Sequence, residues 1–320
     1  MASSTSSLQL GIMLEGQEDL TWPRFLRLAQ AVEDLGFESL FRSDHLSALE
    51  TDPSRESLAL WPSLTALALQ TKRIRFGPLV CSMTFRHPAL VAKMAASIDV
   101  LSGGRFELGI GAGWNRPEHR MFGIPFPPYQ TRLEILDESA QVIRALWTGK
   151  PANFAGRHYQ LNSAETHPVP LQNPAPLIMG GKNEKHTLRL VAQYATEWNC
   201  TYFSPEAFQR KSAVLDRHCQ DIGRDPATLR RSLMIPFAIG RTTAEVQQRI
   251  DAHRRMFPSL PASLAGWRDA GYLAGSPADI TDQLNEFAAV RVVRCMMQHN
   301  DLDDLGSLQL LAAEVLPHFG

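Results

Sequence analysis

The sequence predicts an α/β protein: a single (β/α)8 barrel in which eight parallel strands are each followed by a helix. Short apolar or β-branched runs alternate with amphipathic helical stretches along the 320 residues. Such an alternation requires a parallel sheet, which an open doubly wound sheet would also satisfy. Eight units in about 300 residues, with no change of composition at a midpoint, favour the closed barrel. One domain, residues 1–320, is therefore predicted.

The first half of the chain supplies four strand-helix units. Strands are expected at 8–14, 39–42, 74–80 and 106–110. The first helix begins near Thr21, carries Pro23 in its first turn and ends at Gly36. A second helix is expected at 58–70, a third from Pro88 to the Gly pair at 103–104, and a long one after the proline-rich stretch 124–128, ending at Gly149.

The second half repeats the rhythm with two interruptions. Strands are expected at 177–179, 197–202, 233–239 and 292–298, and helices at 184–194, 205–220, 244–254 and 278–288, with a last helix ending near 316. Stretches 150–175 and 256–275 break the pattern and are interpreted as insertions at the barrel rim. A surface strand is expected at 156–161, inside the first insertion. Residues 1–7 are interpreted as a loose tail.

Composition excludes several functions. Apolar residues make up 44%, charged residues 20%, and the formal net charge is −1. This balance, without a basic run, argues against nucleic-acid binding. No apolar stretch reaches the ~20 residues of a membrane helix, and the start lacks the basic region of a signal peptide. The four cysteines are scattered and the histidines dispersed, so no metal site is expected and a reduced, cytoplasmic setting fits best.

Barrel enzymes place their sites at the C-terminal ends of the strands, which makes Asp44-His45 the sharpest candidate pair. A carboxylate beside an imidazole can orient it, tune its protonation or bond to a heteroaromatic ring. The alternative interpretation is an aspartate that caps the next turn and a histidine that fills the rim. Other strand ends include Glu15, Val80-Cys81-Ser82 and Gln298-His299-Asn300.

Two glycine-rich strand ends suggest contacts with a cofactor. Gly180-Gly181 follows a strand and precedes a predicted helix start, an arrangement that binds anions through exposed backbone N–H groups, and Lys182 adds a positive charge. The alternative is a tight turn that needs glycine for its backbone angles. The run from Gly109 to Gly113 lacks the full dinucleotide fingerprint, and small residues there would let a flat ring lie against the backbone.

These residues resemble the luciferase-like flavin oxidoreductases, especially the branch that uses coenzyme F420. The resemblance runs over most of the chain. It is carried by Thr84-Phe-Arg-His-Pro88, Leu101-Ser-Gly-Gly-Arg-Phe-Glu-Leu-Gly-Ile-Gly-Ala-Gly-Trp-Asn115, Glu118-His-Arg-Met-Phe-Gly-Ile-Pro125, Pro176-Leu-Ile-Met-Gly-Gly181, stretches of 187–199, and the helix start at 275–280.

The resemblance implies specific cofactor contacts. His45, after Asp44, would lie close to the ring system, and Leu79-Val80 would form a non-prolyl cis peptide that presses against the central ring. Ser82 belongs to the same strand end. Ala112 and Gly113 would flank the cofactor, and Gly180, Gly181 and Lys182 would hold its phosphate.

One departure from the family concerns substrate chemistry. Its sugar-phosphate dehydrogenases carry a glutamate directly after the glycine that matches Gly113, where this chain has Trp114. This weighs against a sugar-phosphate substrate. Trp114 would instead form an apolar wall, and Glu118 is a candidate acid in the following loop.

Three functions stay open. The first is F420-dependent hydride transfer to or from a small organic substrate. The second is a monooxygenase that uses reduced FMN from a partner flavin reductase and inserts oxygen from O2. The third is a non-catalytic cofactor-binding homologue. A homodimer is expected from the resemblance, and the two insertions are expected to decide specificity.

Overall fold

The computed structural model describes residues 8–319, so the tail predicted at 1–7 lies outside the described residues. Its main sheet is parallel, with the order β3-β2-β1-β12-β10-β9-β8-β5-β4. The barrel strands are β1 (Gln9–Leu14), β2 (Ser39–Arg42), β3 (Arg75–Pro78) continued by β4 (Cys81–Ser82), β5 (Leu108–Gly111), β8 (Leu177–Gly180), β9 (Glu197–Thr201), β10 (Arg230–Ile239) and β12 (Arg294–Gln298). A parallel bridge between Phe76 and Phe106 joins the ends of this order. The predicted (β/α)8 barrel is confirmed.

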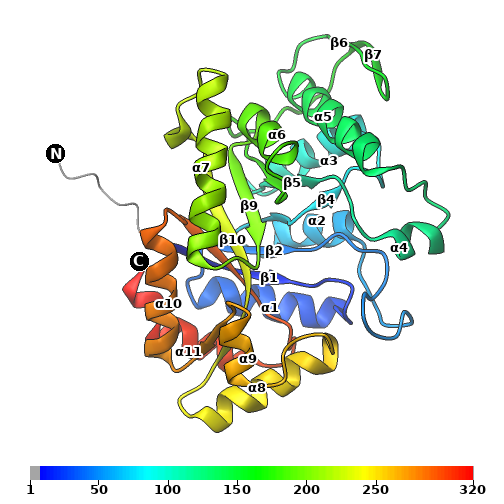
Figure 1. Ribbon diagram of the computed structural model, residues 1–320. Helices are drawn as coiled ribbons and strands as arrows, with labels where there is room; N and C mark the ends of the chain where they lie inside the picture. The colour runs from blue at the N-terminus through cyan, green and yellow to red at the C-terminus, as the bar shows by residue number, and fades with distance from the viewer. Residues whose placement is uncertain (1–7, 320) are drawn as a thin grey trace.

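The helices lie around the outside of the strands (Figure 1). They are α1 (Trp22–Asp34), α2 (Leu60–Gln70), α3 (Pro88–Leu101), α4 (Arg116–Met121), α5 (Tyr129–Leu146), α6 (Thr187–Tyr194), α7 (Pro205–Asp221), α8 (Thr243–Met256), α9 (Leu264–Asp269), α10 (Pro277–Ala289) and α11 (Leu305–Glu314), with single 3-10 turns at Pro226–Thr228 and Leu316–His318. Local chemistry sets their ends. The Thr21 side chain caps the start of α1 by accepting the backbone N–H of Arg24. Ser276 and Asp279 form a reciprocal capping box at the start of α10.

Side chains inside the barrel form three layers, because alternate residues of each strand point inward. Along β12 these residues are Arg294, Met296 and Gln298. Arg294 is fully buried at the N-terminal end, where it forms ion pairs with Glu107 and Glu197. The middle layer is an apolar cluster that contains Met13, Phe41, Leu79, Ile178, Met234 and Met296. This cluster closes the barrel below the polar layer at the C-terminal mouth.

The first insertion differs from its prediction. It forms a hairpin of β6 (Ala152–Ala155) and β7 (Gln160–Ala164), so the strand expected at 156–161 was wrong, since most of that stretch is the turn. The Glu138 carboxylate of α5 accepts the backbone N–H groups of Arg157, His158 and Tyr159. The hairpin consequently lies outside α5, away from the mouth (Figure 1).

The second insertion does cover the mouth. It contains α9 and the short strand β11 (Leu273–Gly275), which pairs with the far end of β10. Trp267 of α9 is fully buried and anchors the segment through its indole N–H, which donates to the Pro261 carbonyl at 2.8 Å. β10 has ten residues and begins earlier than the sequence predicted, and its last three residues pair with β11. Across residues 8–319, no helix has the length and apolarity needed to cross a bilayer.

Candidate active site

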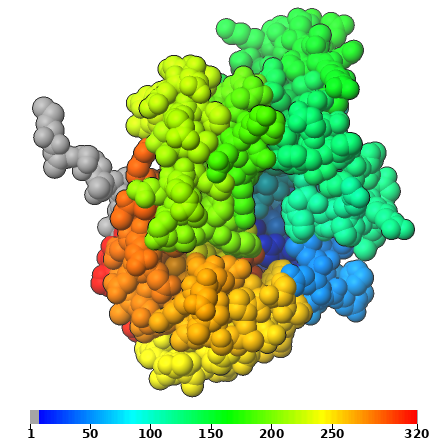
Figure 2. Space-filling view, in the orientation of Figure 1, coloured from blue at the N-terminus to red at the C-terminus, as the bar shows by residue number. Residues whose placement is uncertain are grey.

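A cavity of about 680 Å³ lies at the C-terminal ends of the barrel strands. Figure 2 shows its opening as a hollow between the blue-green segment that contains α4, the light-blue loop after β2 and the yellow-orange segment of α8 and α9. Every residue predicted for the site lines this cavity: Asp44, His45, Leu79, Val80, Ser82, Ala112, Gly113, Trp114, Glu118, Gly180, Gly181 and Lys182. Its size suits a drug-sized molecule or an elongated cofactor headgroup.

His45 is oriented by Glu118 of α4. Its Nδ1 atom lies 3.0 Å from Glu118 Oε2, and the other carboxylate oxygen accepts the backbone N–H of Leu46. Burial disfavours the charged imidazolium, but the Glu118 hydrogen bond and the charges of Glu15, Glu118 and Asp44 outweigh it. The pKa of His45 is therefore raised above its ordinary value. Because Nδ1 is engaged, Nε2 is the nitrogen available to a ligand.

Asp44 makes no hydrogen bond to the His45 ring within residues 8–319, although its charge contributes to the raised pKa of that ring. Its carboxylate is instead held by both terminal nitrogens of Arg86 and by the backbone N–H of Ser82 at 3.3 Å. Adjacent residues at the end of a strand point in different directions, which is why Asp44 and His45 separate. Asp44 therefore fixes the loop that follows β4, and Arg86, within the quoted Thr84–Pro88 motif, is a site residue that sequence analysis missed.

Val80 forms the floor of the cavity against a surface of glycines. The Leu79–Val80 peptide is cis, as the family resemblance implied. A Cβ at Gly111 would come within 2.6 Å of a Val80 methyl, and one at Gly109 within 3.1 Å. The bulge can lie against β5 only because these strand positions lack side chains. The glycines between 109 and 113 therefore allow close packing against the Val80 bulge, in addition to the approach of a flat ring that the sequence suggested.

Gly180, Gly181 and Lys182 form the neighbouring wall, after β8, and a Cβ at Gly180 would come within 3.4 Å of a Val80 methyl. Gly181 has φ +150°, and a Cβ there would come within 2.2 Å of the Thr187 methyl, so this turn requires glycine. The helix expected from residue 184 begins three residues later, at Thr187, because 182–186 form turns instead. The Lys182 amino group lies 5.5 Å from the centre of the Tyr202 ring and 5.2 Å from that of Phe203. Burial lowers the pKa of Lys182.

Trp114 covers the entrance. Its side chain is 66% exposed, and its ring meets the His45 ring edge to face with centres 5.6 Å apart. Gly113 precedes it with φ +73°, and a Cβ there would lie 2.5 Å from Ser82 Oγ. This backbone turn brings the indole over the imidazole. The apolar wall predicted for Trp114 matches its place at the mouth.

The sequence analysis named Glu15 and Gln298 as strand ends but assigned them no role. The Gln298 amide donates to Glu15, and the Tyr202 hydroxyl donates to Gln298 at 3.0 Å. The backbone of Tyr202 has φ +56°. Two arginines of the loops outside the barrel lie away from the cavity. Arg157 pairs with Glu134 and Arg241 with Glu314, and no arginine of residues 8–319 lines the cavity.

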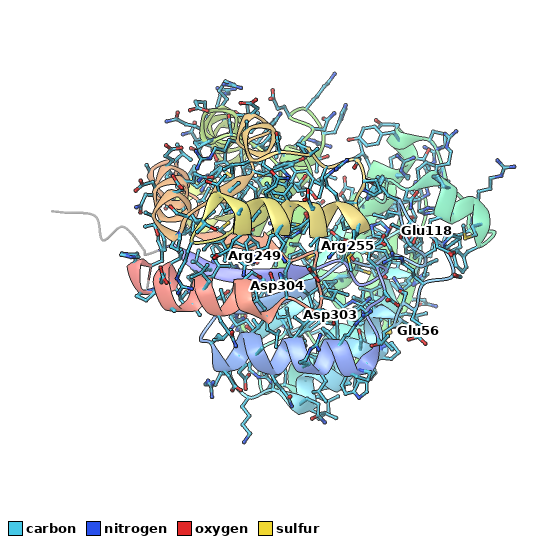
Figure 3. All side chains as sticks on the ribbon, turned by 90° about the horizontal axis from the view of Figure 1, so that it is seen from below. Glu56, Glu118, Arg249, Arg255, Asp303 and Asp304 are labelled. Atoms are coloured by element: carbon cyan, nitrogen blue, oxygen red, sulfur yellow. The ribbon has the colours of Figure 1, made fainter. Side chains whose placement is uncertain are left out.

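A separate charged cluster lies away from the mouth. Arg249 of α8 pairs with Asp304 at 2.9 Å, at the start of α11. Figure 3 shows this pair apart from Glu118, which belongs to α4. Its place between two outer helices indicates a structural contact.

The barrel, the cis peptide at its floor and the histidine held by a carboxylate are together typical of the luciferase-like class of oxidoreductases. The family model "Luciferase-like monooxygenase" matches residues 3–294. The chain belongs to the luciferase-like monooxygenase family.

Individual relatives point to two chemistries. The chain is 34% identical to an F420-dependent glucose-6-phosphate dehydrogenase of Amycolatopsis mediterranei over 169 residues, 52% of this chain and 48% of that protein. It is 30% identical to the pyrimidine monooxygenase RutA of Stutzerimonas stutzeri, over 62% and 56% of the two chains. These matches thus span about half the length of the curated relatives.

A solved structure shows the same fold over the whole chain. An F420-dependent secondary alcohol dehydrogenase, in complex with an F420-acetone adduct, superposes with a TM-score of 0.83. The alignment covers 98% of this chain and 99% of that one at 19% identity.

Proposed function

We propose that this protein is an oxidoreductase that uses coenzyme F420 to transfer hydride to or from a small organic substrate at the barrel mouth. The observation that carries the proposal is that two neighbouring surfaces line one cavity. Val80 rises from β3–β4, and the Gly180–Lys182 turn lies beside it at the end of β8. A flat ring against Val80 and a phosphate at the glycine turn would lie next to each other in the cavity.

The residues fit such a cofactor. The positions that a side chain would block, Gly111 and Gly113, are glycines, and their substitution would push against Val80 or Ser82. Gly181 and Lys182 offer a backbone turn and a cation to a phosphate. When bound, a deazaflavin supplies two-electron hydride chemistry, while the protein supplies position and electrostatics.

His45 is the proton-handling residue in this proposal. The Glu118 hydrogen bond fixes its ring and favours its protonated form, so Nε2 can donate a proton to a substrate oxygen or nitrogen during reduction and recover it in reverse. Trp114 restricts the entry of water above it. Asp44 acts through Arg86 and the backbone of Ser82, and positions the loop beneath the ring.

The relatives' glucose-6-phosphate is not the proposed substrate. Trp114 stands where those enzymes carry a glutamate, and no arginine in the described chain reaches the cavity to bind a second phosphate. A second candidate function is a reduced-FMN-dependent monooxygenase served by a partner reductase. The similarity to a pyrimidine monooxygenase favours it, and the same cavity would hold the flavin.

The cofactor experiment separates the two. Purified protein is titrated with F420 and with oxidised and reduced FMN, and binding is followed by quenching of tryptophan fluorescence. We expect saturable quenching by F420 and loss of part of the signal in Trp114→Phe, because Trp114 lies at the mouth. Trp147→Phe, on the outer helix layer, is the matched control.

Three results would overturn the proposal. Binding of FMN without binding of F420 would favour the monooxygenase. Binding of neither cofactor would contradict all three alternatives, whereas binding of F420 without turnover of any candidate substrate would favour the non-catalytic homologue. With F420 bound, His45→Asn should abolish turnover of a candidate substrate while cofactor affinity stays within about three-fold, since the ring is held mainly by backbone and apolar contacts.

A further inference from the structure

The cavity has a second polar end, between β1 and β12, on the side of the barrel away from Lys182. Glu15 follows β1 and Asn300 follows β12, and the register that pairs Met13 with Gln298 brings them to adjacent positions. Both line the cavity and both are buried, with exposed fractions of 7% and 2%. The proposed function assigns neither residue a role.

This end offers hydrogen-bond acceptors. Glu15 Oε2 accepts the Gln17 amide at 2.9 Å, and Oε1 accepts that of Gln298. A carboxylate has about four acceptor positions, so two stay open. The Asn300 Oδ1 atom has no hydrogen-bond partner at all within the described chain. The Asn300 residue lines the cavity, and a buried carbonyl oxygen without a partner calls for a donor.

The donors nearest to Glu15 are already used. Tyr202 gives its hydroxyl hydrogen to Gln298, and the Gln298 and Gln17 amides point at Glu15. A ligand group that binds Glu15 must donate hydrogen bonds, because a carboxylate only accepts them. A carboxylate or phosphate would meet the negative charge of Glu15.

The charge at this end is also unpaired. In residues 8–319, Glu15 has no ion pair with a basic side chain. Two cationic groups act on Glu15 through their charge without a hydrogen bond to it: His45, whose pKa Glu15 helps to raise, and Arg42. Arg42 is fully buried behind Gly16 and bonds neutral oxygens of Ser43, Ser63 and Leu58. Arg42 eases the burial of Glu15 from behind but occupies none of its positions on the cavity side.

Aromatic rings complete the pocket. Tyr202 and Tyr272 both line the cavity and meet edge to face, with centres 5.7 Å apart. The Lys182 amino group already lies 5.5 Å from the centre of the Tyr202 ring, so Tyr272 is the ring left to attract a desolvated cation through its quadrupole. Because β1 and β8 lie on opposite sides of the barrel, the cavity has an anionic end at Glu15 and a cationic end at Lys182.

We propose that the β1–β12 end of the cavity recognises a positively charged nitrogen of the substrate, an alkylammonium or arylalkylammonium, held by Glu15 and Asn300 beside Tyr202 and Tyr272. This inference rests on the proposed function only in placing the substrate in the same cavity. It narrows the substrate class to amines, or to compounds that carry an amine beside the reacting group.

Three probes of one shape test the proposal: benzylamine, benzyl alcohol and benzoate, titrated at pH 7 in low salt and followed by ligand-observed NMR. We expect the ammonium to bind about ten-fold more tightly than the alcohol, equivalent to about 1.4 kcal/mol, and benzoate to bind most weakly. Glu15→Gln should remove the preference for ammonium over alcohol. Glu165→Gln, an exposed glutamate of the first insertion, is the control and should leave it unchanged.

Each contrary result is informative. Benzoate or the alcohol binding as tightly as the ammonium would overturn the proposal, and so would an unchanged preference in Glu15→Gln. If circular dichroism shows that Glu15→Gln does not fold, Asn300→Leu serves instead and should weaken ammonium binding about three-fold or more. The F420 and FMN titrations are run on the same preparations. Cofactor binding without ammonium preference overturns this inference alone, and ammonium preference without cofactor binding overturns only the proposed function.

Discussion

The Glu118 carboxylate contacts two adjacent residues of the loop after β2: one oxygen lies 3.0 Å from His45 Nδ1 and the other accepts the Leu46 N–H. Glu118 comes from α4, a six-residue helix 73 positions along the chain. The carboxylate that sets the protonation of His45 therefore comes from a different βα unit than the histidine.

Replacing Glu118 with Gln should lower the pKa of His45. The substitution keeps the shape but removes the negative charge that favours imidazolium, while burial continues to oppose it. We expect the His45 resonance in a histidine-labelled NMR titration to move at lower pH, and turnover at neutral pH to fall about ten-fold. Glu165→Gln is the control. An unchanged His45 titration in Glu118→Gln would contradict the positioning role.

Replacing Arg86 with Met should destabilise the fold strongly. Asp44 has a side chain that is only 1% exposed, and Arg86 is its cationic partner. Loss of one partner of a buried pair leaves an uncompensated charge and costs about 3–5 kcal/mol. Urea denaturation measures the change. The matched control is Arg241→Met, which breaks the exposed pair with Glu314 and should cost less than about 1 kcal/mol.

Acid should destabilise the protein through two histidines that do not line the cavity. His299 and His253 are fully buried, and burial lowers their pKa values to about 4 and about 3. The unfolded chain, with imidazoles near 6.5, binds more protons than the native state between pH 6.5 and 3, so stability is lost as pH falls through this window. The free energy of unfolding against pH shows the effect.

His299→Leu should flatten that pH dependence. Both ring nitrogens of His299 lack partners in residues 8–319, so an apolar side chain there leaves no protein hydrogen bond broken. We expect stability close to wild type at pH 7.5 and a gain on the order of 3 kcal/mol relative to wild type at pH 4. His318→Leu, at an exposed position, is the control. A variant that loses stability in acid as steeply as wild type would show that His299 does not carry the effect.

Gly111→Ala should weaken cofactor binding while the barrel still folds. The new Cβ would meet a Val80 methyl at 2.6 Å and push the floor into the cavity. Overpacking of this kind costs about 1–3 kcal/mol. Where this cost destabilises the complex with cofactor more than the free protein, the affinity for the cofactor falls roughly ten-fold or more. Fluorescence titration measures it. Gly306→Ala, in the first turn of α11 and outside the cavity lining, should leave the affinity unchanged.

Much of the barrel was predictable because its signals are local. Strand 39–42 and the helix from Pro88 have the bounds that the pattern indicates, since burial on one face imposes a period that the sequence displays. The surface strand expected at 156–161 was misplaced. Gly156 and its polar neighbours instead form the turn of a hairpin, held by the side chain of Glu138, which is distant in the sequence. Helix α4 is too short to show a period.

The sequence by itself determined which residues stand at the strand ends, and hence the lining of the mouth: Asp44, His45, Val80, the glycines and Lys182 follow from counting strands. Only the tertiary structure decided which of them touch. It pairs His45 with Glu118 instead of Asp44, gives Asp44 to Arg86, and leaves Glu15 and Asn300 open to the cavity. Strand position is set by local periodicity, whereas side-chain partners are set by how separate βα units pack around the barrel, which no single segment encodes.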